Sequence, residues 1–91
     1  MRIVKLDRRH RQFKEHGHTM ALRFSDWSTE AQRYERAAEA RLRGTGWNRG
    51  SSWYSYFGSR PTKYNSRPYW ITFRNEQDLT IVLLSVTENN H

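Results

Sequence analysis

Cysteine is absent from this 91-residue chain, and proline occurs only twice. Without cysteine there can be no disulfide bonds or thiolate metal ligands, so packing, alone or with a second subunit, must stabilise the fold. The length fits one domain, and a domain of this size buries only about 60% of its unfolded surface. We therefore predict a single domain over residues 1–91, with no room for a separate catalytic unit.

Long apolar runs are also missing. The longest, residues 81–84, falls far short of the roughly 20 residues of a membrane-spanning helix. The first residues lack the apolar core of a signal peptide. We expect a soluble protein that does not bind membranes and resides in the cytoplasm, that of the host cell if the chain is viral.

Acidic side chains are missing from residues 40–75, although the whole chain carries a net charge of +7. Such a balance favours nucleic acid, an anionic membrane or an acidic protein surface as the partner. A second basic cluster makes residues 1–17 a basic N-terminal arm or edge strand. The acid-free span contains the cations Arg41, Arg43, Arg49, Arg60, Lys63, Arg67 and Arg74 and the rings Trp47, Trp53, Tyr54, Tyr56, Phe57, Tyr64, Tyr69, Trp70 and Phe73.

The first half of the chain predicts strands and one clear helix. Residues 1–6 alternate weakly, as in a short edge strand, and residues 7–17 read as a loop or a frayed helical turn ended by Gly17. Alternation over residues 18–24 predicts a half-buried strand. Residues 28–43 predict a helix with Ser28 as its N-cap. Its apolar stripe consists of Trp27, Ala31, Tyr34, Ala38 and Leu42, and Glu35 and Glu39 are expected on a solvated face.

The second half predicts two strands, over residues 53–57 and 69–74, joined by a polar loop between Pro61 and Pro68. Residues 76–86 fit either a hairpin strand or a helix. We favour the helix because the Asn75 cap, the acids of the first turn and the apolar spacing agree. The predicted fold is α+β: a small antiparallel sheet of three to four strands with two helices on one face, a split β-α-β, ferredoxin-like variant. The other face would be open, or covered by the N-terminal arm or a second subunit.

Residues 67–83 resemble the third strand and following helix start of RNA-recognition-motif domains. The matching residues are Trp70, Ile71 and Phe73 in the strand and Asn75, Glu76 and Asp78 at the helix start. The resemblance covers roughly one fifth of the chain. The sequence departs from the motif in two ways. Arg67 and Tyr69 occupy the positions before the aromatic residues at which the motif has glycine, and too few residues remain after residue 86 for a normal fourth strand.

Residues 69–84 are also similar to the end of short bacteriophage-encoded proteins of unassigned function, in which a turn of the Phe-Arg/Asn-Glu type leads into a final apolar helix. Residues 21–24 add to this likeness. The resemblance implies a phage protein, with a role in host takeover as one expectation, and implies no mechanism.

Aromatic faces and cations are what single-stranded nucleic acid requires, because bases stack on rings and Lys/Arg neutralise phosphates. Strand alternation separates Tyr54, Tyr56 and Trp70 from inward-facing Trp53, Phe57, Tyr69, Ile71 and Phe73, although most rings of so small a domain belong in its core. The loop at residues 59–67 is either a phosphate-contacting finger or an ordinary solvated loop. The candidate nucleic-acid-binding residues are Arg49, Tyr54, Tyr56, Arg60, Lys63, Tyr64, Arg67, Trp70 and Arg74.

Catalytic and metal-binding patterns are not found. His16 and His18 form a pair without the further ligands of a tetrahedral metal site, and neither a nucleophile elbow nor a phosphate-binding loop is present. We expect no enzyme and no cofactor. The favoured function is a small basic nucleic-acid-binding accessory protein acting on RNA or DNA, single-stranded in preference. The alternatives are a module that inhibits or modulates an acidic host protein and a self-assembling structural or virion component, including a homodimer.

Overall fold

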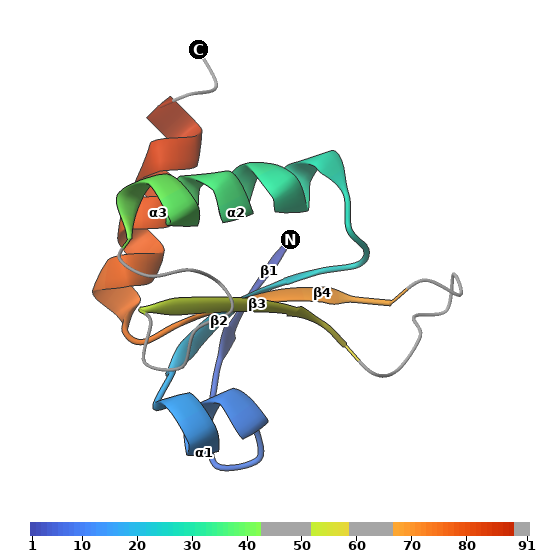
Figure 1. Ribbon diagram of the computed structural model, residues 1–91, viewed down its shortest axis with the longest axis vertical. Coiled ribbons are helices and arrows are strands. Elements are labelled where there is room, and N and C mark those ends of the chain that lie inside the picture. Colours follow the sequence, from blue (N-terminus) through green and yellow to red (C-terminus); the bar gives the residue numbers. More distant parts are fainter. Residues whose placement is uncertain (43–51, 59–66, 89–91) are drawn as a thin grey trace.

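The computed structural model describes residues 1–42, 52–58 and 67–88 (Figure 1). Along the chain they form β1 (Arg2–Lys5), α1 (Arg11–His16), β2 (Met20–Phe24), α2 (Thr29–Arg41), β3 (Trp53–Phe57), β4 (Tyr69–Phe73) and α3 (Glu76–Glu88). The strands make one four-stranded antiparallel sheet in the order β1-β2-β4-β3. The predicted α+β class with a small antiparallel sheet is confirmed.

The sheet contains a split β-α-β unit. β2 and β3 are joined through α2, and β4 lies between them, antiparallel to both. This arrangement, followed by α3, is the core of a ferredoxin-like fold. The edge beside β2 is taken by β1, which precedes the unit in the chain, so no strand after α3 is needed to complete the four-stranded sheet.

Both long helices begin at residues whose side chains cap them. The Ser28 hydroxyl accepts a hydrogen bond from the Ala31 N–H at 3.2 Å, and the Asn75 side-chain oxygen accepts one from the Asp78 N–H at 2.9 Å. Each cap satisfies a backbone donor that has no partner within the helix. The helical interpretation of residues 76–86 is confirmed, and the hairpin alternative is wrong.

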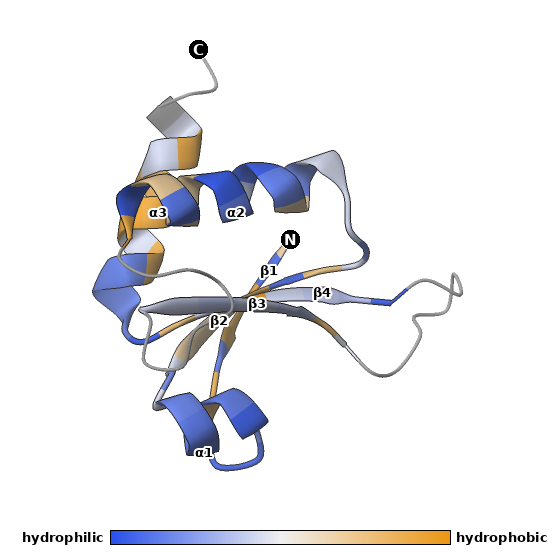
Figure 2. Cartoon of the chain, in the orientation of Figure 1, coloured by the Kyte–Doolittle hydropathy of each residue, from blue (hydrophilic) through white to orange (hydrophobic). Residues whose placement is uncertain are grey.

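The core lies between the sheet and the pair α2 and α3, which pack on one face (Figure 1). Figure 2 shows the contrast between the helices: α3 carries several hydrophobic residues, whereas α1 is hydrophilic almost throughout. The stripe predicted on α2 is buried at Ala31 and Ala38, and Ala37 is buried with them. The largest fully buried apolar side chains come from the strands and are Leu22, Phe24, Ile71 and Phe73.

The segment at residues 7–17 contains a defined helix. α1 lies on the side of the sheet away from α2 and α3 (Figure 1). It ends at Gly17, whose φ of 68° lies in the left-handed region that favours glycine. The Gly17 N–H bonds the Phe13 carbonyl at 3.1 Å. Of the expected coverings for the second sheet face, the N-terminal arm is the one that the structure places there.

Two expectations for the helix-covered face are wrong. Glu35 does not belong to a solvated face: it is half-buried, and its Oε1 atom accepts hydrogen bonds from the Tyr69 hydroxyl at 2.6 Å and the Ser55 hydroxyl at 2.8 Å. Trp27 precedes α2 and packs against Tyr69, with ring centroids 4.3 Å apart, instead of extending the helical stripe. Phe57 faces the helix side at the sheet edge but remains 51% exposed.

Candidate nucleic-acid interface

The sheet face away from α2 and α3 carries a row of side chains that crosses all four strands. The register pairs Arg2 with Arg23, Arg23 with Trp70 and Trp70 with Tyr56. Because directly paired residues point to the same side of a sheet, these four side chains share one face. The row runs from two cations on β1 and β2 to two aromatic rings on β4 and β3. We call these four residues the cross-sheet row.

The aromatic half of the row is extended along β3 by Tyr54. The rings of Tyr56 and Trp70 are nearly parallel, at 3°, with centroids 6.3 Å apart. Tyr54 lies 5.8 Å from Tyr56. All three side chains are half-buried, so each presents part of its surface outward. The neighbouring strand positions Ile71 and Phe73 point the other way and are fully buried.

The cationic half of the row contacts the aromatic half directly. The guanidinium carbon of Arg23 lies 5.9 Å from the Trp70 ring centroid, within the range of a cation–π contact. Arg2, its neighbour on β1, is exposed. Arginine beside a ring can stack with it and still direct N–H groups at an anion. The row therefore places phosphate-type and base-type contacts side by side.

Helix α1 covers one part of this face. The imidazole of His16 stacks on Tyr54, with centroids 5.3 Å apart and planes at 19°, and its side chain is only 6% exposed. His10, just before α1, lies 6.5 Å from the Trp70 ring. Tyr54 is thus partly covered by the helix, and Tyr56 and Trp70 are the better candidates for stacking with a ligand.

Beneath α1 the face is polar but closed. His18 is buried, and its Nδ1 atom lies 2.8 Å from the Thr72 hydroxyl, which is also buried. The rings of His16 and His18 are 5.6 Å apart. Within the described part of the chain, no three His, Cys, Asp or Glu side chains are grouped to hold a metal ion. The two histidines here serve as packing partners of Tyr54 and Thr72.

Burial changes the acidity of one ring on this face. Desolvation, with a smaller effect from Tyr54, raises the pKa of Tyr56 to about 12. The hydroxyl therefore stays neutral at physiological pH and adds no negative charge that would repel phosphate. At the start of α1, hydrogen bonds from Arg9 lower the pKa of Asp7 to about 2, so this carboxylate is already paired beside the face.

Of the nine residues predicted from the sequence, Tyr54, Tyr56 and Trp70 come together. Arg67 and Arg74 are exposed at the two ends of β4. Arg49, Arg60, Lys63 and Tyr64 lie outside the described residues. Sequence reasoning missed Arg2 and Arg23. Arg23 was detectable, because it alternates with inward-facing Leu22 and Phe24 and must therefore point to the same side as Trp70.

Comparison of the chain with protein-family models, with curated proteins and with solved structures finds no match. Of the three strand residues that resemble the RNA-recognition motif, only Trp70 lies on the open face, since Ile71 and Phe73 belong to the core. In the described residues, no helix is both long and apolar enough to cross a membrane.

Proposed function

We propose that the protein is a small basic, non-enzymatic accessory protein that binds single-stranded nucleic acid across the open face of its sheet. The cross-sheet row carries this proposal, because it sets Arg2 and Arg23 beside the rings of Trp70 and Tyr56. Bases stack on the rings, and the backbone phosphates lie against the guanidinium groups. Stacking tolerates any base, so sequence preference is weak.

The setting of this function is also part of the proposal. The likeness of residues 69–84 to short phage proteins supports a phage-encoded factor that acts in the host cytoplasm during host takeover. The net charge of +7 supports a polyanionic partner.

The test is a titration of labelled single-stranded and duplex oligonucleotides, followed by fluorescence anisotropy at several salt concentrations. We expect micromolar or tighter binding to the single strand, weakened by salt. Trp70→Ala should reduce affinity by roughly 5- to 150-fold, the equivalent of about 1–3 kcal/mol for one stacked base. Trp27→Ala is the matched control, because Trp27 is 40% exposed and packs at the helix side of the sheet. Equal losses in both variants, or no salt-sensitive binding, would refute the proposal.

A protein partner is the second candidate function. Trp27 and Phe57 form an exposed pair with ring centroids 6.2 Å apart, and exposed aromatic residues of this kind are typical binding hot spots. The protein would then inhibit or modulate an acidic host protein. Pull-down from nuclease-treated host lysate separates the two functions: a partner retained by the wild type and by Trp70→Ala, but lost from Trp27→Ala, favours this candidate.

Self-assembly into a homodimer or a virion component is a third role for the same open face. Exposed aromatic surface can pair with a second copy. Size-exclusion chromatography with light scattering tests it, and a monomer at high concentration would count against this role.

A further inference from the structure

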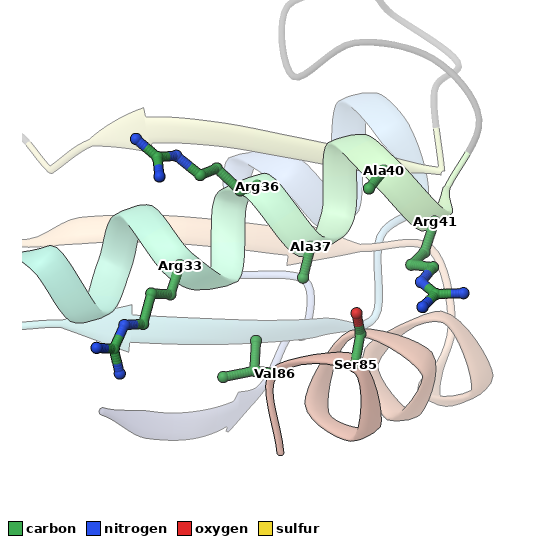
Figure 3. Close-up of a pocket in the computed structure, with 7 residues that line it drawn as sticks. All are labelled: Arg33, Arg36, Ala37, Ala40, Arg41, Ser85 and Val86. Atoms are coloured by element: carbon green, nitrogen blue, oxygen red, sulfur yellow. The ribbon is translucent and has the colours of Figure 1, made fainter. Parts of the chain in front are cut away.

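A second basic surface lies on the helix side of the molecule. A surface cleft of about 560 Å³ lies along the contact between α2 and α3 (Figure 3). Its α2 side includes Arg33, Ala37, Ala40 and Arg41, and its α3 side includes Ser85 and Val86. α2 and α3 cover one face of the sheet (Figure 1), and the cross-sheet row points to the opposite face because it alternates along β4 with the buried Ile71 and Phe73. This cleft is therefore separate from the proposed nucleic-acid interface.

Small side chains form the middle of the cleft. Ala37 and Ser85 face one another across it in Figure 3, with Val86 beside them. Two helices pack at about 8–10 Å between axes when the side chains at the contact are small. Ile81 lies one turn before Ser85 on the same side of α3 and is 37% exposed. It continues the apolar surface along α3.

Ser85 gives the cleft a polar group that the protein does not use. The residue is only 5% exposed, and its hydroxyl points across the cleft towards α2 (Figure 3). Among the described residues it forms no hydrogen bond. Because Ser85 lines the cleft, its hydroxyl can bond to water or to a polar group of a ligand.

Arginines stand at the two ends of this surface. Arg33 and Arg41 leave α2 on the same side as Ala37, Arg41 directly towards α3 and Arg33 beyond Val86, whereas Arg36 points to the opposite side (Figure 3). The two positions are eight residues apart on α2, which is about 12 Å along a helix at 1.5 Å per residue. Acidic residues two turns apart on a partner helix have a similar separation of about 10–12 Å. Among the described residues that line the cleft, none has an aromatic ring for base stacking.

We propose that the cleft between α2 and α3 binds an acidic amphipathic helix of a partner protein. Small apolar side chains of that helix pack against Ala37, Val86 and Ile81. Two of its carboxylates, about two turns apart, pair with Arg33 and Arg41. A polar group of the helix bonds the Ser85 hydroxyl. The surface is small, so binding is transient, as in other interfaces at the low end of the size range.

The probe is a fluorescein-labelled helical peptide of roughly 20 residues, about 30 Å long, with a stripe of alanine and leucine flanked by glutamates two turns apart. The same peptide with lysine in place of glutamate is the matched control. We expect micromolar anisotropy binding of the acidic peptide, at least tenfold loss in R33E/R41E, and no binding of the lysine peptide. Ala40→Trp, at an exposed lining position, should block the cleft without a charge change and also lose binding.

R8E/K14E is the matched charge control, because both residues are exposed and lie away from the cleft, Arg8 before α1 and Lys14 within it. Melting curves establish that each variant is folded. Equal loss of peptide binding in the control would mean attraction by net charge alone and would overturn the proposal. Unchanged peptide binding in both R33E/R41E and Ala40→Trp would also overturn the proposal. So would variants that keep peptide binding but lose oligonucleotide binding, because the cleft would then contact phosphate.

Discussion

The two faces of β3 and β4 use aromatic side chains in opposite ways. Towards α2 and α3, Phe73 is fully buried and Tyr69 donates its hydroxyl to Glu35. On the other side, Trp70 and Tyr56 remain half-buried beside cations. The residues alternate along the same strands, so composition alone does not distinguish them. Their neighbours decide whether a ring stabilises the fold or remains available to a ligand.

The largest expected effect is on stability. Phe73→Ala should lower the free energy of unfolding by about 3–5 kcal/mol, because it leaves a cavity in the core. Trp70→Ala should cost much less, since its ring is not enclosed. Urea unfolding followed by circular dichroism measures both. If the two variants lose equal stability, the division between the faces is wrong.

The hydrogen bonds of Glu35 provide a second test of the difference between the two sheet faces. Tyr69→Phe removes a donor to a half-buried carboxylate, and we expect a loss of about 1.5 kcal/mol, the lower range for bonds to a charged group. Tyr56→Phe, on the open face, should change stability little at neutral pH. Thermal melts of both variants provide the measurement. A larger loss of stability in Tyr56→Phe than in Tyr69→Phe would contradict the stabilising role of the Tyr69–Glu35 hydrogen bond.

Alkaline pH should weaken the fold through both tyrosines. Burial raises the pKa of Tyr56 to about 12, and burial together with the bond to Glu35 raises that of Tyr69. Because the folded protein favours the neutral hydroxyls, their stabilisation is complete below about pH 10, the ordinary tyrosine pKa, and is lost as pH rises towards the folded values. Unfolding free energies measured across this range should decline, and less steeply in Tyr56→Phe. An identical slope in that variant would show that Tyr56 titrates normally.

The smallest expected effect concerns a single phosphate contact. Arg23→Ala should reduce the salt dependence of single-strand binding, lowering the slope of log affinity against log salt by about 0.7. Lys5→Ala is the control, because Lys5 is paired with Met20 and points to the other side of the sheet. Equal slopes in wild type and Arg23→Ala would remove Arg23 from the interface.

Local patterns were enough to predict most of the fold. Alternation assigned Tyr54, Tyr56 and Trp70 to one side, and the Asn75 cap with its acids identified α3. These signals depend on residues near one another in the chain. The six residues of α1 are too few for a helical period to be recognised.

Contacts between distant residues could not be predicted. Arg2 joins the cross-sheet row only through the register of β1 with β2, and no local pattern specifies that register. Glu35 appeared to be one of two solvated acids on α2, but Ser55 and Tyr69, which lie 20 and 34 residues away in sequence, hold it at the sheet. The place of Arg2 in the candidate interface and the partners of Glu35 therefore became visible only in the folded chain.

The position of β1 at the sheet edge has a consequence for the order of folding. β1, α1 and β2 follow one another directly, so this edge can assemble from nearby residues as soon as they are synthesised. The His18–Thr72 contact between the β2 and β4 segments spans 54 residues, and such long-range closure is slow because it must first overcome chain entropy. A nascent chain would therefore carry a preformed basic β1-α1-β2 unit in which one edge of β2 is still unpaired. If synthesis stopped before β4, aggregation would begin at this exposed edge.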